Sequence, residues 1–270
     1  MRQLLSIATL PLATTGLGLL MWSGMTTAAL QMRPDGASTL HQLQWLGLFC
    51  GGLLVATSAV ARRLLRLPAS HDRGRTRMLV AAALALAAVL CVLLLGGAWA
   101  GQGPLLVALG IALLLAAFGS VAALATDLGA GPAPAPWRHP LVLPVQLLWA
   151  MTAGLALLYL LMDRLFTTGG DGRTMLLTLT GLGLCLAVCK GVYWHATGPT
   201  PAARRGARAG VPALLVLGPL LGWLLARADG MPTVVPLSLA TVCVLAAALL
   251  DQHLFAREGA DAMPASTEET

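Results

Sequence analysis

The chain of 270 residues is 57% hydrophobic and only 10% charged, with a formal net charge of +6. Soluble globular domains carry about 25% charged residues, so this composition excludes a soluble enzyme, a disordered protein and a coiled coil. The basic residues lie in short loops between apolar runs, which argues against a nucleic-acid partner and in favour of topology signals. We therefore predict an all-α, polytopic membrane helix bundle.

Eight apolar runs follow one another along the chain, and each is close to the ~20 residues that a spanning helix needs. The predicted spanning helices are 4–30, 43–61, 78–100, 105–125, 141–162, 174–194, 210–226 and 233–250. The first run is too long for the apolar core of a signal peptide, so we expect it to be retained as a helix. Residues 1–250 then form one eight-helix domain, and residues 251–270 an acidic tail, with an interfacial helical turn and a disordered end.

The basic residues indicate how the bundle lies in the membrane. Eight helices place both ends of the chain on one face, together with the second, fourth and sixth loops. Most of the 17 lysines and arginines fall on that face, above all in residues 62–77 and 204–208. Because loops rich in lysine and arginine stay in the cytoplasm, we predict that both termini are cytoplasmic.

Polar side chains inside an apolar run are costly and are therefore the first candidates for function. Lys190 lies near the end of the sixth run. It is either a lysine that snorkels to the cytoplasmic interface or a contact for a quinone head group or a partner subunit. Gln146, near one end of the fifth run, is interpreted as an interhelix hydrogen bond rather than a ligand contact.

The loop at residues 62–77 is rich in arginine and contains His71 and Asp72. Its simplest role is to set topology and to contact anionic lipid, and the alternative is a docking surface for an acidic or iron–sulfur partner. His71 and Asp72 can exchange protons within the physiological range, so they are candidates for proton transfer.

The five histidines lie at run ends or in loops, and the five cysteines lie inside apolar runs without a C-x-x-C motif. A haem held between helices needs two facing histidines, and a structural metal site needs a cluster of ligands. We therefore expect this chain to bind no haem and no metal ion.

Three short segments carry a resemblance to a known family. Residues 136–144 read PWRHPLVLP, residues 190–194 read KGVYW at the end of the sixth run, and residues 251–258 read DQHLFARE. Together with eight spans in this length, these segments resemble the membrane anchor subunit of dimethyl sulfoxide reductases, the DmsC family. The family's His-Leu-Gly-x-Pro and Ser-Arg-Glu segments around the second loop are replaced here by ARRLLRL at 61–67 and DRGR at 72–75.

The resemblance implies a subunit of the bacterial inner membrane that anchors a four-cluster iron–sulfur subunit and a molybdopterin catalytic subunit. It implies electron transfer to them from menaquinol or ubiquinol in anaerobic-type respiration. The iron–sulfur clusters and the molybdopterin then belong to the partners, and this chain holds no cofactor and has no catalytic residue. The candidates for the quinol environment are His71, Asp72, His139, Lys190 and Tyr193, with Trp137 and Trp194 packing at the interface.

Two other functions are compatible with this composition. A transporter or permease subunit would place polar groups and broken helices at the middle of the bilayer. A purely structural membrane protein would need no quinol site at all. The three possibilities differ in their partners, because only the anchor subunit requires an iron–sulfur subunit and a molybdopterin subunit.

Overall fold

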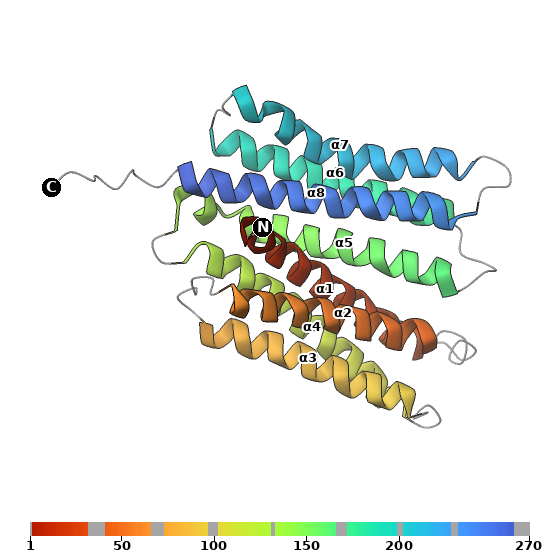
Figure 1. Cartoon of the computed structure of the whole chain (residues 1–270). Coiled ribbons are helices and arrows are strands. Elements are labelled where there is room, and N and C mark those ends of the chain that lie inside the picture. The colour runs from red at the N-terminus through yellow and green to blue at the C-terminus, as the bar shows by residue number, and fades with distance from the viewer. Residues whose placement is uncertain are drawn as a thin grey trace.

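The computed structural model describes residues 2–31, 41–65, 73–96, 102–130, 133–165, 172–198, 202–227 and 232–261. These residues form eight long helices, each long and apolar enough to cross a membrane. The helices lie side by side in one bundle (Figure 1). Their bounds are α1 Arg2–Gln31, α2 His41–Leu64, α3 Arg73–Leu95, α4 Gly103–Leu128, α5 Val142–Leu165, α6 Gly172–Ala196, α7 Ala202–Leu225 and α8 Val234–Asp261, with a short 3-10 helix, η1, at Ala135–Arg138. The prediction of eight spanning helices is confirmed.

Large apolar side chains cover the outward faces of these helices. Phe49, Leu115 and Val92 are 57%, 64% and 68% exposed, and Val188 and Val242 are similarly uncovered. Such a surface suits the hydrocarbon of a bilayer, where each helix satisfies its own backbone hydrogen bonds. The chain is therefore a multi-pass membrane protein.

Helix α1 is the centre of the bundle and packs against α2, α4 and α5. Glycines make these contacts possible, because small residues let neighbouring backbones approach closely. A Cβ added to Gly18 would lie 1.8 Å from the carbonyl oxygen of Ala150 on α5. A Cβ added to Gly24 would lie 2.6 Å from the carbonyl oxygen of Gly110 on α4. The backbone of α1 thus touches two neighbours directly.

Helix α8 continues well beyond the apolar run that predicts it. The run ends at residue 250, whereas the helix continues to Asp261. One face of the added segment is buried against the bundle. This face consists of Asp251, Leu254, Phe255 and Glu258. In place of the single interfacial turn that the sequence suggested, residues 251–261 therefore form three further turns of a packed helix.

Candidate functional site

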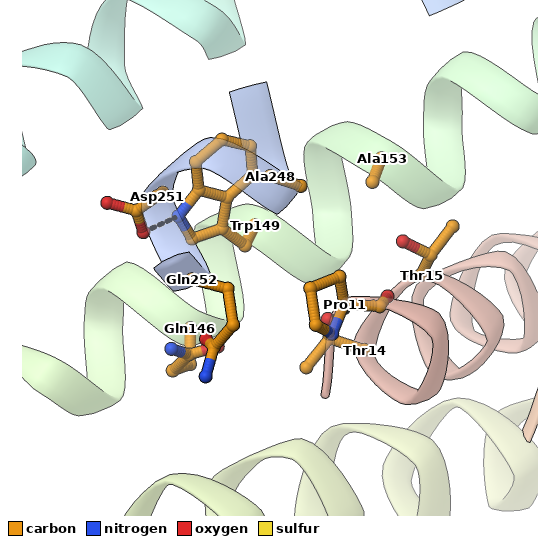
Figure 2. Close-up of a pocket in the computed structure, with 9 residues that line it drawn as sticks. All are labelled: Pro11, Thr14, Thr15, Gln146, Trp149, Ala153, Ala248, Asp251 and Gln252. Carbon is orange, nitrogen blue, oxygen red and sulfur yellow. Dashed lines mark hydrogen bonds between the residues drawn. The ribbon is translucent and has the colours of Figure 1, made fainter. Parts of the chain in front are cut away.

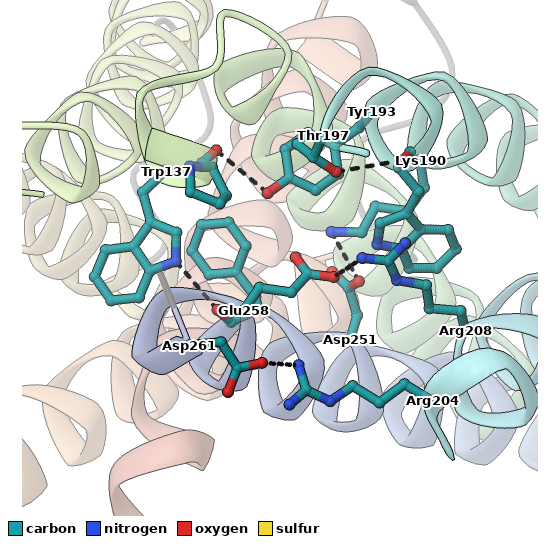
Figure 3. Close-up of polar contacts among 12 residues, drawn as sticks. Trp137, Lys190, Tyr193, Thr197, Arg204, Arg208, Asp251, Glu258 and Asp261 are labelled. Atoms are coloured by element: carbon teal, nitrogen blue, oxygen red, sulfur yellow. Dashed lines mark hydrogen bonds and ion pairs between the residues drawn. The ribbon is translucent and has the colours of Figure 1, made fainter. Parts of the chain in front are cut away.

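The three segments that carry the family resemblance meet at the end of the bundle where α8 ends (Figure 3). Trp137 comes from η1, Lys190 and Tyr193 from α6, and Asp251 and Phe255 from α8. We call the assembled side chains the Lys190 cluster. It consists of Trp137, His139, Trp149, Lys190, Tyr193, Trp194, Arg208, Asp251, Phe255 and Glu258.

A buried ion pair lies at the centre of this cluster. The Lys190 ammonium is 2.8 Å from a carboxylate oxygen of Asp251, and the two side chains are only 3% and 4% exposed. The other Asp251 oxygen accepts a hydrogen bond of 2.9 Å from the indole N–H of Trp149 on α5. A buried pair is tolerated when its remaining hydrogen-bonding positions are also satisfied. Asp251 thus connects α5, α6 and α8.

Aromatic rings surround the Lys190 ammonium on its other sides. Its nitrogen lies 4.7 Å from the ring centroid of Tyr193, 5.4 Å from that of Trp194 and 5.5 Å from that of Phe255. Each distance is within the range of a cation–π attraction. The ammonium therefore points into the bundle, and the snorkelling interpretation of Lys190 is corrected: a carboxylate and three rings from the protein replace the water at the membrane surface.

Two further ion pairs join α7 to the extension of α8. The Arg208 guanidinium lies 2.8 Å from Glu258, and it also lies 5.4 Å from the ring centroid of Trp194. Nearer the surface, Arg204 pairs with Asp261, whose side chain is 55% exposed. The acidic residues of 251–261 are thus placed opposite the basic residues of α6 and α7.

The segment 136–139 closes the cluster from the side of η1. The indole N–H of Trp137 donates to the backbone oxygen of Phe255 at 3.1 Å, and the two rings stack with centroids 5.3 Å apart. The hydroxyl of Tyr193, a residue only 1% exposed, donates to the backbone oxygen of Pro136 at 3.3 Å. The ring of His139 meets the Tyr193 ring edge-on, with centroids 5.7 Å apart.

The structure brings together His139, Lys190 and Tyr193 of the five predicted quinol-site residues, and it places Trp137 and Trp194 beside them. His71 and Asp72 lie outside the described residues. The remaining members of the cluster were not predicted as site residues from the sequence. They are Trp149, Arg208, Asp251, Phe255 and Glu258. The available signal was the spacing of Asp251 and Glu258, since residues seven apart lie on one face of a helix.

A small cavity adjoins the cluster between α1, α5 and α8 (Figure 2). Its volume of about 10 Å³ is close to what one water molecule needs. Asp251, Gln146 and Gln252 line it, together with Thr14, Thr15 and Trp149. Gln146 is 6% exposed, and no described residue hydrogen-bonds its side chain. This differs from the expected interhelix hydrogen bond, because the Gln146 amide borders a cavity instead.

A larger groove lies beside the small cavity and is almost wholly apolar. It has a volume of about 400 Å³ and is lined by α1, α2, α5 and α8. Pro11 and Thr15 of α1 line both spaces, so the groove and the small cavity adjoin. The groove is therefore an apolar space with a polar end.

No group of three or more His, Cys, Asp or Glu side chains among the described residues is arranged to hold a metal ion. No protein-family model matches the chain, and no curated protein or solved structure shows significant similarity to it. The fold and hydropathy define the class to which the chain belongs, a polytopic eight-helix membrane protein.

Proposed function

We propose that this protein is the membrane anchor subunit of a molybdopterin and iron–sulfur oxidoreductase resembling dimethyl sulfoxide reductase. In this role it tethers an iron–sulfur subunit and a molybdopterin subunit to the bacterial inner membrane and supplies them with electrons from quinol. One observation carries the proposal. The segments 136–144, 190–194 and 251–258, on which the resemblance rests, are far apart in sequence and assemble into the Lys190 cluster.

The contacts between the three segments support the proposal because they indicate that these segments form one site. Unrelated apolar helices would have no reason to bring a Lys–Tyr-Trp segment and an Asp-x-x-x-Phe segment into contact. Here the Lys190–Asp251 pair and the Trp137–Phe255 stack join them. The course of the eight helices already places the three segments at one end of the bundle, so the support comes from the direct contacts between their side chains.

Quinol oxidation releases two protons and two electrons and yields quinone. The chain's own contribution is to bind the quinol, to keep bulk water away and to receive protons at carboxylate or imidazole groups. Asp251 borders the small cavity, and His139 lies at the edge of the cluster. An iron–sulfur cluster held by the partner subunit would accept the two electrons and supply the redox chemistry.

We further propose that both termini and the basic loops face the cytoplasm. The basic residues at the end of α6 and the start of α7 lie on the same side of the bundle as the end of α8. Because lysine and arginine near helix ends determine orientation, this side is the cytoplasmic one. A variant with all five native cysteines replaced by alanine, carrying one new cysteine at Ser266 or at Gly169, tests this orientation when it is labelled with a membrane-impermeant maleimide in intact cells. Only the Gly169→Cys variant should react before the cells are opened.

The decisive experiment is a pull-down of the tagged full-length chain in mild detergent from its native host, with identification of every co-purifying protein. We expect a molybdopterin subunit and a ferredoxin-like iron–sulfur subunit in near-equal amounts. Recovery of the chain alone, or with a nucleotide-binding subunit, would contradict the anchor proposal and favour a structural protein or a transporter.

A second experiment tests the residues. In the purified complex, quinol-linked reduction of the iron–sulfur clusters is compared between the native protein and a variant with His71, Asp72, His139, Lys190 and Tyr193 all replaced. We expect the quinol-linked rate to be lost while reduction by a soluble dye is kept. Unchanged quinol-linked activity would remove these residues from the proposed site.

A further inference from the structure

The small cavity between α1, α5 and α8 differs from the groove beside it in the chemistry of its walls. The groove is lined mainly by leucines, whereas polar side chains from all three helices line the cavity. These are Thr14 and Thr15 of α1, Gln146 and Trp149 of α5, and Asp251 and Gln252 of α8. Figure 2 shows the two glutamines close together, with the Asp251–Trp149 hydrogen bond beside them. A molecule in this space would be held by hydrogen bonds.

Two of these side chains have hydrogen-bonding atoms that the protein does not use. Gln146 is 6% exposed and Thr15 is 4% exposed, and neither side chain hydrogen-bonds a described residue. Thr14 differs from them, because its hydroxyl donates to backbone oxygens of its own helix. Nearly all buried polar groups in folded proteins are paired with the protein or with ordered water. Gln146 and Thr15 therefore need a partner inside the cavity.

The Asp251 carboxylate also has unused capacity. A carboxylate can accept about four hydrogen bonds. One Asp251 oxygen lies 2.8 Å from the Lys190 ammonium, and the other accepts from the Trp149 indole at 2.9 Å. No third donor to this carboxylate is found among the described residues. A donor in the cavity that Asp251 lines would complete its hydrogen bonding.

The size of the cavity restricts what it can hold. Its volume of about 10 Å³ is at the lower limit of the roughly 10–15 Å³ that one water molecule requires. A lipid head group or a metabolite, with several non-hydrogen atoms, has no room there. Cavities that stay dry are lined by apolar side chains, which is not the case here.

The charges beside the cavity argue against an ion. Lys190 already neutralises Asp251, so a metal cation would enter a site without net negative charge and would be repelled by the ammonium. An anion would meet the Asp251 carboxylate, which lines the cavity. Burial of an uncompensated charge costs far more than burial of a hydrogen-bonded neutral molecule. The matching occupant is small, uncharged, and both a donor and an acceptor.

We infer that the cavity is a binding site for a single water molecule. The water donates to the Asp251 carboxylate and shares hydrogen bonds with the Gln146 amide and the Thr15 hydroxyl. Three partners is the usual number for a buried water. The water joins α1 to α5 and α8, so the interhelix hydrogen bond expected for Gln146 is made through it. This inference does not depend on the proposed function, because a transporter or a structural protein would hold the same water.

The first test measures contact between water and the Gln146 amide. Full-length protein with isotope-labelled glutamine is placed in lipid nanodiscs, and magnetisation transfer from water to the side-chain amide protons is recorded by NMR. The Gln146 signals are assigned as those that disappear in Gln146→Leu. We expect transfer to the Gln146 amide. Its absence in the native protein overturns the inference.

The second test fills the cavity. Ala248 lines the cavity and is 8% exposed, so Ala248→Val places two methyl groups where the water would lie. Ala246→Val is the matched control, because Ala246 lies on the same helix, is half-buried and does not line the cavity. We expect transfer to Gln146 to be lost in Ala248→Val and kept in Ala246→Val. Transfer that persists in Ala248→Val contradicts a water in this space.

A third variant keeps the test decisive if Ala248→Val does not fold, which size-exclusion profiles in detergent reveal. Thr15→Val has the same shape as the native side chain and removes one partner of the water without adding bulk. We expect the water to exchange with bulk solvent about tenfold faster, the effect of losing one good hydrogen bond. An unchanged exchange rate overturns the placement of the water between α1 and α5.

Discussion

The two halves of the bundle differ in the ion pairs that join their helices. In α1–α4, glycines allow backbones to touch, as at the Gly24–Gly110 crossing between α1 and α4. In α5–α8, the three ion pairs found among the described residues all join α6 or α7 to α8. The first half is thus stabilised by close packing of uncharged surfaces. The second half has glycine contacts of its own, as between Gly183 of α6 and the backbone of Leu215 on α7, and adds the compensation of opposite charges.

This difference indicates which kinds of substitution should lower the stability of each half. A backbone contact has no room for an added atom, so the first half is sensitive to groups that are gained. A buried ion pair leaves an uncompensated charge when one partner is removed, so the second half is sensitive to groups that are lost as well as to groups that are gained. Helix α1 belongs to both halves, because it also crosses α5 at Gly18.

The largest effect is expected from an added methyl group at the centre of the bundle. In Gly18→Ala, the new Cβ would lie 1.8 Å from the backbone oxygen of Ala150, so α1 and α5 must separate at a cost of about 3 kcal/mol or more. Gly52→Ala is the control, since its nearest neighbour lies at 3.9 Å on a leucine side chain. Size-exclusion profiles and thermal denaturation in detergent measure both. Equal behaviour of the two variants would contradict the backbone contact.

Removal of a charge is expected to destabilise the other half on a similar scale. Lys190→Met leaves the buried Asp251 carboxylate without its cation, at a cost of about 3–5 kcal/mol. The double variant with Asp251→Leu removes both charges and should recover most of that loss. Chemical denaturation of the three proteins in detergent gives the comparison. A double variant no more stable than Lys190→Met would show that the loss in Lys190→Met does not come from an uncompensated Asp251 charge.

A smaller effect is expected where the η1 segment meets α8. In Gly259→Ala, the new Cβ would lie 2.4 Å from the ring of Trp137, and displacement of that ring should cost about 1–3 kcal/mol. Gly191→Ala on α6 is the control, because nothing lies within 4 Å of the added atom. Thermal midpoints measure the loss, and the combination Gly259→Ala with Trp137→Leu should relieve it. If the double variant is no more stable than Gly259→Ala, the loss of stability does not come from a clash with the Trp137 ring.

The smallest effect is expected from a hydrogen bond in the first half. Thr76 on α3 donates to a carboxylate oxygen of Asp127 on α4 at 2.7 Å, and Thr76→Val should cost about 1 kcal/mol. Thr57→Val provides the control, since Thr57 is exposed and bonds the backbone of its own helix at Leu54. A loss in Thr76→Val as large as that in Gly18→Ala would contradict the view that packing dominates this half.

The helices could be predicted from sequence because each apolar run has the length that a bilayer demands. The length of α8 could not be predicted in the same way. Residues 251–261 contain charges that resemble a solvated tail when their neighbours are unknown. Their partners Lys190 and Arg208 lie on other helices. Pairing between distant segments depends on three-dimensional packing, which hydropathy along the chain does not contain.

The same limit applied to the candidate site. Lys190 could be singled out because a cation inside an apolar run is rare, but neither its direction nor its partner follows from that observation. Gln146 was assigned a hydrogen bond to another helix because that is the usual fate of an amide in a bundle. In the structure, the helix crossing leaves a cavity beside it.

The extension of α8 has a consequence for how the protein is made. A ribosome synthesises α6 and α7 before α8, so Lys190 and Arg208 enter the membrane before Asp251 and Glu258 exist. Each nascent chain must therefore hold two cations at a helix end until its last helix arrives. Neutralisation of these charges waits until α8 packs against α6 and α7, so a chain interrupted before residue 251 lacks the two carboxylates that pair with Lys190 and Arg208.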